Sequence, residues 1–346
     1  MSLDAGISKA LLNWYDYNAR ILPWREEPTP YRVWVSEIML QQTRVEAVKP
    51  YYDRFMKELP SVADLAAVED DKLMKLWEGL GYYNRARNLK IAANQVMDEF
   101  DGKIPGDYQL LLSLKGIGEY TAGAIGSIAF GLPVAAVDGN VLRVITRITG
   151  DERDILKQST KKAITEDLLE IIPKERAGDF NQALMELGAM VCVPNGKPKC
   201  EECPWDTICR ACKEELTERI PVKMPKKKRR IEHKTIFLLE YQDKIAIHKR
   251  RSKGLLAGLW EFPNAEGILP VEEVERKLKE WQVTHFQLDT TAKAKHIFSH
   301  IEWHMTGFHI RCEEKPELKD LVWISRQEME DAYAIPTAFA PFKAAL

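Results

Sequence analysis

Four cysteines within eighteen residues constrain the fold of this chain more than any other feature. Their spacing is C-x7-C-x2-C-x5-C, and they follow an apolar run typical of a helix. Short loops can return each sulfur to the same point, so the set predicts a metal site. Sulfur-only ligation favours zinc or an iron–sulfur cluster, and spacing alone leaves disulfides or free thiols as lesser alternatives. The four residues are Cys192, Cys200, Cys203 and Cys209.

The composition is that of an ordinary globular protein with more than one domain. The 346 residues allow two or three cores at roughly 150 residues per domain. Hydrophobic residues make up 45% and charged residues 29% of the chain. No segment reads as a signal peptide or a membrane span. Six cysteines, four of them clustered, fit a reducing compartment, so we expect a cytoplasmic protein without a membrane partner.

A basic segment divides the chain. Between Arg219 and Lys234 lie eight basic residues and one acid, Glu232. Prolines bound this run, which predicts an interdomain linker at residues 221–233. Contact with nucleic-acid phosphates is the alternative, because basic side chains bind phosphate without reading sequence. The net charge of −2 argues against a wholly polyanion-binding surface.

Hydrophobic periodicity differs on the two sides of this linker. In residues 1–220 apolar positions recur every three or four residues between short Gly/Pro breaks, which predicts an all-α domain with the cysteine loop at 192–209. In residues 234–346 the pattern changes to short strands, with a hairpin turn at Gln242-Asp243 and helices from residues 271 and 326. We therefore predict a multidomain protein in which an α+β domain follows the all-α domain.

Two local motifs in the helical domain have the character of a phosphate site and a catalytic acid. In LKGIGEYTA (114–122), Gly116 and Gly118 enter a helix, where backbone amides can bind an anion. A plain tight turn is the alternative reading. Asp138 stands in VDGNV (137–141) and is predicted to cap a helix. We expect this helix end to lower the pKa of the carboxyl and to keep it ionised.

The order of these motifs resembles that of helix–hairpin–helix DNA glycosylases with an iron–sulfur cluster. Three further segments, LPWR (22–25), VSEIMLQQTRV (35–45) and WEGLGYY (77–83), narrow the resemblance to adenine DNA glycosylases of the MutY type. That family removes adenine mispaired with 8-oxoguanine or with guanine. The resemblance covers residues 10 to 340 and implies a six-helix module, a cluster module and a Nudix-like domain.

The resemblance also implies the roles of individual residues. Glu37 would protonate adenine N7, Asp138 would stabilise the cationic sugar, and Tyr120 and Asn140 would support that site. This division of labour suits N-glycosidic cleavage, which needs an acid at the base and negative charge at the sugar. Without the resemblance, Glu37 reads as a surface helix residue. The implied DNA and lesion contacts are Arg25, Gln42, Thr43, Leu80, Tyr82, Gly116 and Gly118.

An absence in the hairpin bears on the reaction. Related enzymes that also cut the DNA backbone use a lysine nucleophile where this chain has Tyr120. We therefore expect a monofunctional enzyme that leaves an abasic site. A bifunctional endonuclease III-like pyrimidine glycosylase and AP lyase, or a non-catalytic DNA-lesion binding protein, are the alternatives. Lys115 lies close in sequence and leaves weak lyase activity open.

The resemblance implies one [4Fe-4S] cluster held by the four cysteines. The family spacing begins C-x6-C, whereas seven residues separate Cys192 from Cys200. Asn195-Gly196 could absorb the extra residue in a turn. Cys212 follows three residues after Cys209 and could compete as a ligand.

The second domain resembles the Nudix-type fold appended to this family. Residues 254–263 read as the lead-in to a Nudix box, but the glutamates of 271–280 lack the order that binds magnesium. We therefore expect a lesion-recognition domain, with Phe298, Ser299 and His300 sensing 8-oxoguanine, and not a nucleotide pyrophosphohydrolase. The expected partner is double-stranded DNA with an A:8-oxoguanine mispair, bound by a monomer in the nucleoid.

Overall fold

The computed structural model describes residues 5–224 and 228–346. The chain forms two compact units. Unit 1 comprises Met1–Ala67 and Arg87–Pro225, and unit 2 comprises Val68–Ala86 and Lys226–Leu346. Segment 68–86 therefore belongs to the unit of the C-terminal domain, although it lies within the helical part of the sequence.

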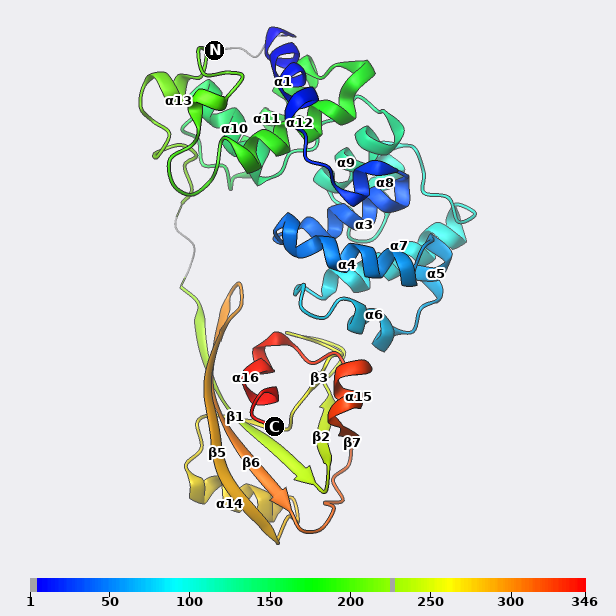
Figure 1. Ribbon diagram of the computed structural model, residues 1–346, viewed down its shortest axis with the longest axis vertical. Helices are drawn as coiled ribbons and strands as arrows, with labels where there is room; N and C mark the ends of the chain where they lie inside the picture. The colour runs from blue at the N-terminus through cyan, green and yellow to red at the C-terminus, as the bar shows by residue number, and fades with distance from the viewer. Residues whose placement is uncertain (1–4, 225–227) are drawn as a thin grey trace. The chain divides into compact units, whose positions relative to one another are not determined.

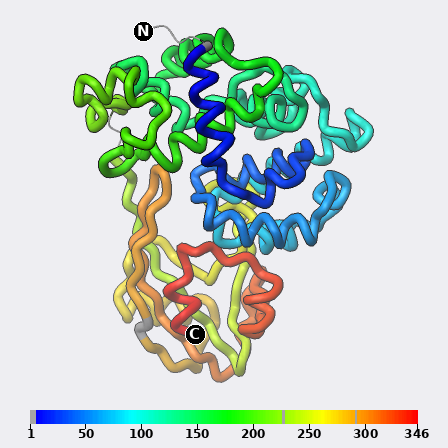
Figure 2. Tube along the Cα trace, turned by 45° about the horizontal axis from the view of Figure 1, so that its top comes forward, coloured from blue at the N-terminus to red at the C-terminus, as the bar shows by residue number. Residues whose placement is uncertain are grey.

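Unit 1 is helical throughout its described residues (Figure 1). Its central helices are α3 (Pro30–Leu40), α9 (Glu119–Phe130), α10 (Gly139–Thr149) and α12 (Ala177–Met190), and α12 packs against both α9 and α10. Helix α1 lies against α12 in Figures 1 and 2. The other helices are α1 (Ala5–Asn18), α2 (Pro23–Glu26), α4 (Val45–Glu58), α5 (Val62–Ala67), α7 (Asn84–Glu99), α8 (Tyr108–Ser113), α11 (Gln158–Ile171) and α13 (Arg210–Lys213), with 3₁₀ turns η1 (Lys174–Arg176) and η2 (Cys200–Glu202).

The helix ends follow from local chemistry. Thr29 caps α3, which begins with a proline, and Asp107 accepts two backbone N–H bonds at the start of α8. Gly131 and Gly150 end α9 and α10 in the left-handed conformation. The predicted hairpin between α8 and α9 is thus confirmed.

One core of unit 1 gathers around α12. Phe180, Leu184 and Leu187 of this helix are fully buried with residues of α1, α10 and α11, and Trp205 of the cysteine loop joins them. Trp205 donates a hydrogen bond to Ile7 O at 3.1 Å. The cysteine loop is therefore part of the helical core and not an appendage.

Unit 2 is built on a seven-stranded sheet of order β3-β2-β1-β6-β5, with β4 paired to β1 and β7 to β2. Strands β1 and β6 are parallel, and β5 and β6 form an antiparallel hairpin. Helix α14 covers one face, while α15, η3 and α16 cover the other. The elements are α6 (Asp70–Leu76), β1 (Arg230–Tyr241), β2 (Lys244–Lys249), β3 (Trp260–Glu261), β4 (Asn264–Glu266), α14 (Val271–Glu280), β5 (Phe286–Ile297), β6 (Ile301–Cys312), β7 (Leu321–Ser325), α15 (Arg326–Asp331), η3 (Thr337–Phe339) and α16 (Ala340–Lys343).

Three boundaries differ from the sequence interpretation. Within the part of the chain predicted to be helical, residues 41–44 separate α3 from α4, and Gln42 there has φ +59°. Strand β1 begins at Arg230, inside the predicted linker, because its N-terminal half pairs with β6. Strand β5 was largely missed, although several of its residues alternate between apolar and polar as expected for a strand. Lys226 and Lys227 of the linker lie outside the described residues.

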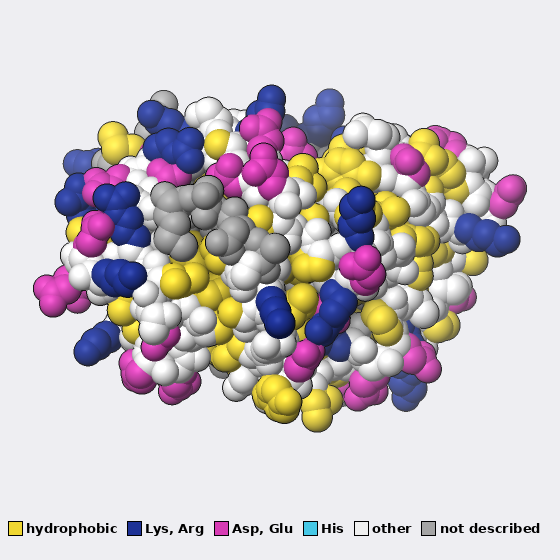
Figure 3. All heavy atoms as spheres, turned by 90° about the horizontal axis from the view of Figure 1, so that it is seen from above, with side chains coloured by type: hydrophobic (Ala, Val, Ile, Leu, Met, Phe, Trp, Pro, Cys, Tyr) yellow, Lys and Arg dark blue, Asp and Glu magenta, His cyan; other side chains and the backbone are white. Residues whose placement is uncertain are grey.

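The surface carries mixed charge, in keeping with the net charge of −2. Figure 3 shows a face on which basic and acidic side chains are interspersed among hydrophobic ones. None of the helices in the described ranges combines the length and apolar character that crossing a membrane requires.

We predict that Gly123→Ala destabilises the protein. A Cβ at this position would lie 2.2 Å from Ala135 O, a backbone atom that cannot move aside alone. Overpacking of this kind costs about 1–3 kcal/mol or more. Urea unfolding measures the effect. Gly139→Ala is the matched control, because its Cβ would meet no atom within 4 Å, and equal stability of the two variants would contradict the packing described above.

Candidate active site and cysteine pocket

Unit 1 contains a cavity of about 140 Å³ between α3, α9, α10 and α12. Polar and charged side chains from distant parts of the sequence line it together with apolar ones. Four residues predicted as catalytic, Glu37, Tyr120, Asp138 and Asn140, all line this cavity. The remaining lining residues are Arg20, Leu22, Trp24, Arg25, Val33, Ser36, Leu40, Thr43, Val45, Ile128, Gln182, Met185, Glu186 and Ala189.

Glu37 is the buried acid of this cavity. It lies on α3, its side chain is 5% exposed, and Tyr120 OH donates a short hydrogen bond to its Oε2. The pKa of Glu37 is raised to about 7, mainly by burial and also by the nearby Asp138, while Tyr120 and Arg25 oppose the shift. A carboxyl group that holds a proton near neutral pH can act as a general acid. Burial excludes the surface-residue interpretation.

Asp138 is both a helix cap and a cavity residue. Its Oδ1 accepts from the backbone N–H groups of Asn140 and Val141 at 2.9 and 2.8 Å, and its Oδ2 accepts from Asn140 Nδ2 at 2.7 Å. The expectation of a lowered pKa was wrong. Burial raises the pKa of Asp138 above its ordinary value and outweighs these hydrogen bonds, which lower it. The three donors still hold the carboxyl in one orientation.

An ion cluster on the cavity wall was missed by sequence reasoning. Glu186 on α12 is 2% exposed and accepts from Arg20 Nε and Nη2 at 2.8 and 2.7 Å and from Arg25 Nη2 at 3.1 Å. Burial raises the pKa of Glu186, but the two arginines lower it overall. Arg25 was predicted as a DNA contact, and here it lies in the cavity wall. The available signal was an isolated acid within the apolar run of α12.

The glycine hairpin has the geometry that the motif required. Gly116 has φ +79°, and a Cβ there would lie 2.6 Å from Asn88 Cβ. Gly118 caps α9 in an extended conformation with no atom near its missing Cβ. The N-terminus of α9 is therefore open to an anion such as a phosphate.

The predicted lesion contacts fall in both units. Gln42 is exposed and Thr43 half-buried in the turn after α3, in unit 1. Leu80 and Tyr82 belong to unit 2, where Leu80 is 6% and Tyr82 is 49% exposed. Of these two, only Tyr82 offers substantial side-chain surface to a ligand.

Phe298, Ser299 and His300 form the three-residue turn between β5 and β6. Phe298 N donates to Ile301 O at 2.8 Å, and its ring packs on Trp303 at 4.8 Å between centroids. Ser299 Oγ lies 3.4 Å from Tyr82 OH. Two predicted lesion contacts that lie 217 residues apart in sequence are thus neighbours within unit 2.

The cysteines line a second pocket in unit 1. Cys192, Cys200, Cys203 and Cys209 surround it, and Cys212 joins them. Burial raises the pKa of the Cys203 thiol to about 12 and that of Cys200 to about 11. Five sulfur donors on one pocket fit a thiolate-bound group such as an iron–sulfur cluster. In the ranges 5–224 and 228–346, however, no three His, Cys, Asp or Glu side chains are grouped so that they could hold a metal ion.

Two arginines of α10 connect its catalytic end with the cysteine loop. Arg143 donates to Asn140 Oδ1, Gly188 O and Cys192 O at 2.7–2.8 Å. Arg147, one turn later, donates to Cys192 Sγ at 3.3 Å and to Val193 O at 3.1 Å. The position of the cysteine loop and that of Asp138 therefore depend on the same helix.

Comparison with family models gives two matches. The model described as HhH-GPD superfamily base excision DNA repair protein matches residues 35–174. The NUDIX domain model matches residues 235–345. The two matches support the all-α and Nudix-like parts of the fold prediction.

Curated relatives carry the name adenine DNA glycosylase. The human protein is 33% identical, over 95% of this chain and 72% of the relative. The Buchnera aphidicola (subsp. Schizaphis graminum) protein is 36% identical, over 86% of this chain and 85% of the relative. The Arabidopsis thaliana protein is 37% identical, and this chain spans about half of its length (55%).

Solved structures similar to this chain include a DNA glycosylase and an endonuclease III bound to DNA. A thermostable thymine-DNA glycosylase matches with a TM-score of 0.55 and 31% sequence identity. The match covers 60% of this chain and 96% of the glycosylase chain. Endonuclease III in a non-covalent complex with DNA matches with a TM-score of 0.54 and 25% sequence identity. The match covers 62% of this chain and 99% of the endonuclease III chain.

We predict that Arg143→Met lowers the free energy of unfolding by about 1–3 kcal/mol, because the buried Gly188 O, the partly buried Cys192 O and Asn140 Oδ1 lose this donor. Urea unfolding measures it. Arg153→Met is the matched control: that arginine pairs with Asp151 at the surface, so its loss should cost less than about 1 kcal/mol. Similar losses in both variants would contradict a special role of Arg143.

Proposed function

Because this chain belongs to the adenine DNA glycosylases, a family with an HhH-GPD base excision repair domain, we propose that it removes adenine mispaired with 8-oxoguanine in duplex DNA. The observation that carries this proposal is the cavity of unit 1, where the buried acid Glu37 and the carboxyl of Asp138 face one space. The motifs at 22–25, 35–45 and 77–83 support adenine and 8-oxoguanine as the specific pair.

Adenine within a duplex cannot reach an enclosed cavity, so the nucleotide must first rotate out of the stack. The open N-terminus of α9 offers backbone amides to a DNA phosphate during this step. The apolar walls at Leu22, Trp24 and Val33 suit the faces of a purine. The charged wall at Glu186 suits its polar edge, because the arginines fix this carboxylate as a hydrogen-bond acceptor.

Glu37 would donate its proton to N7 of the extruded adenine. The electron pair of the C1′–N9 bond then leaves with the base, and positive charge develops on the deoxyribose. A pKa of about 7 leaves Glu37 largely protonated below neutral pH and makes it a competent acid. Tyr120, bonded to Oε2, would keep the carboxyl aimed into the cavity.

Asp138 would stabilise the cationic sugar until water attacks C1′. Its three hydrogen-bond donors favour the ionised carboxylate and hold it against rotation. Tyr120 occupies the position where backbone-cutting relatives carry a lysine, so no Schiff base would form there. The product would be an abasic site on an intact strand.

We further propose that Cys192, Cys200, Cys203 and Cys209 hold one [4Fe-4S] cluster. The sulfur-lined pocket and the family resemblance support this ligand set. When bound, the cluster would supply structural order to the loop that Arg143 and Arg147 attach to α10. We also propose that the protein acts as a monomer.

We predict that Glu37→Gln strongly slows base release while it stabilises the fold. Loss of the general acid should slow adenine release from an A:8-oxoguanine duplex roughly 10²–10⁴-fold. The raised pKa of Glu37 means that its burial costs stability progressively as pH rises from about 4.5 to about 7. Above pH 7 the glutamine variant should therefore gain up to about 3 kcal/mol of unfolding free energy.

Gel electrophoresis of the DNA products, with and without alkali treatment, distinguishes the outcomes of this experiment. The parent should yield strand breaks only after alkali, which reveals an abasic product. Breaks without alkali would favour the bifunctional glycosylase and lyase, and undiminished adenine release by the variant would remove Glu37 from its role. Binding without release by the parent would favour a non-catalytic lesion-binding protein.

We also predict that base release slows above neutral pH. The protonated fraction of Glu37 falls as pH rises through about 7, so the single-turnover rate should decline about tenfold per pH unit well above that value. The hydrogen bond from Tyr120 lowers the pKa of Glu37, so Tyr120→Phe should move the midpoint to higher pH. A rate that stays constant from pH 7 to 9 would contradict the assignment of the acid.

A further inference from the structure

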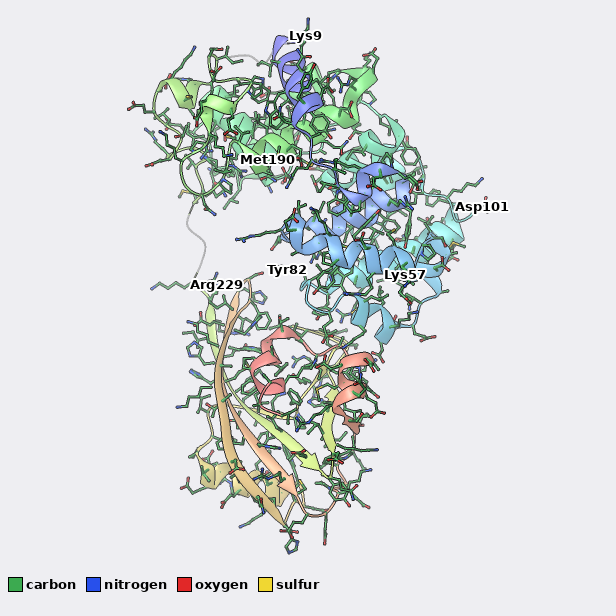
Figure 4. All side chains as sticks on the ribbon, in the orientation of Figure 1. Lys9, Lys57, Tyr82, Asp101, Met190 and Arg229 are labelled. Atoms are coloured by element: carbon green, nitrogen blue, oxygen red, sulfur yellow. The ribbon has the colours of Figure 1, made fainter. Side chains whose placement is uncertain are left out.

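Segment 68–86 is attached to the C-terminal domain by a set of specific bonds. Helix α6 (Asp70–Leu76) carries Asp71 and Lys75, and Glu78 follows the helix. Each of these three side chains contacts residues 249–335 of unit 2. Tyr82, labelled in Figure 4, lies on the loop that follows. Residues Gly79–Tyr82 are called the tyrosine loop below.

Lys75 and Glu78 form the most enclosed of these contacts. Lys75 Nζ donates to Glu78 Oε2 at 2.6 Å and to the carbonyls of Met329 and Tyr333 at 3.2 Å each. Glu78 Oε1 accepts from Ile335 N at 2.9 Å. The two side chains are 17% and 20% exposed. Because each member of the ion pair also binds the backbone of 329–335, the pair, called the clamp below, fixes position as well as charge.

The tyrosine loop begins directly after this clamp and has a defined shape. Gly79, Gly81 and Tyr82 all have positive φ, at +100°, +70° and +48°. Arg85 Nη2 donates to Leu80 O and Gly81 O at 3.1 Å, and its guanidinium lies 5.5 Å from the Tyr82 ring. The loop is therefore braced from its C-terminal side by Arg85 and anchored at its N-terminal side by Glu78.

Two further hydrogen bonds within unit 2 fix the turn that carries Ser299. Its turn is fixed by Arg229 Nε, which donates to Phe298 O at 3.1 Å, and by Arg230 N, which donates to His300 O at 3.1 Å. The Tyr82 OH to Ser299 Oγ distance of 3.4 Å thus depends on two separately anchored segments. A shift of segment 68–86 against residues 329–335 would separate this pair.

We propose that Lys75 and Glu78 are positioning residues that keep Tyr82 and Ser299 together, so that recognition of 8-oxoguanine requires the clamp. This inference rests on the proposed function, in which Tyr82 and Ser299 read the lesion. Neither clamp residue lines the active-site cavity, so hydrolysis of a bound substrate does not use it. Selectivity for the lesion, and not the chemical step, is what the clamp supports.

The chain offers a matched control at the same contact. Asp71 on α6 binds Lys249 Nζ at 2.7 Å, but the two side chains are 45% and 44% exposed. An exposed pair of this kind is screened by water and contributes little. Asp71→Asn therefore removes a charge from the same helix without releasing the tyrosine loop.

The test measures single-turnover adenine release against enzyme concentration, with adenine opposite 8-oxoguanine or opposite guanine. For Glu78→Ala and Lys75→Met we expect the half-saturating concentration on the 8-oxoguanine duplex to rise about tenfold, with the maximal rate within twofold of the parent. On the guanine duplex both parameters should change less than twofold. Lys75→Arg keeps the positive charge and should retain part of the selectivity that Lys75→Met loses. Asp71→Asn should match the parent on both duplexes.

A double-mutant cycle separates positioning from general destabilisation. If the clamp acts through Tyr82, adding Glu78→Ala to Tyr82→Ala should change the lesion preference less than twofold further. Full additivity, equal losses on both duplexes, or an equal effect of Asp71→Asn would each overturn the inference. A parent enzyme without preference for the 8-oxoguanine duplex would instead overturn the proposed function, which keeps the two failures distinguishable.

Discussion

The burial of one carboxyl group determines most of what unit 1 can do. Glu37 lies inside the helical core, bonded to Tyr120 and close to Asp138, so its proton is held until about pH 7. This arrangement is costly for the fold, because the ionised form is poorly solvated there. It is also what makes an acid available at neutral pH. A more exposed carboxyl would be ionised and unable to donate.

Helix α10 connects Asp138 with the cysteine loop. Its first turn is capped by Asp138, its second is fixed by Arg143, and its third meets Cys192 through Arg147. Loss of order in the loop would therefore reach the cavity through Arg143, which binds both Cys192 O and Asn140 Oδ1. The proposed cluster would influence catalysis in this way without contacting the substrate.

Unit 2 combines elements from two distant parts of the sequence. Segment 68–86 interrupts the helical unit. The side chains of its Lys75–Glu78 ion pair form hydrogen bonds with the backbone of 329–335 and so join it to the C-terminal domain. Within the same unit, Tyr82 OH lies 3.4 Å from Ser299 Oγ. The residues proposed to recognise the lesion therefore lie together in the unit of the Nudix-like domain. The glutamates of 271–280 in this domain lack the order that binds magnesium.

The sequence by itself determined the features that depend on neighbouring residues. Cysteine spacing, the glycine hairpin, the Asp138 cap and the change from helical to strand periodicity are all local patterns. The tertiary structure alone decided the properties that arise from distant contacts. The pKa of Glu37 is raised because the packed helices bury its side chain. Burial also raises the pKa of Asp138, although the hydrogen bonds at its helix cap lower it. Glu186 is held in the cavity wall by Arg20 and Arg25, which lie more than 160 residues away in sequence. Solvation and long-range pairing are set by the packed chain, so no local pattern could contain them.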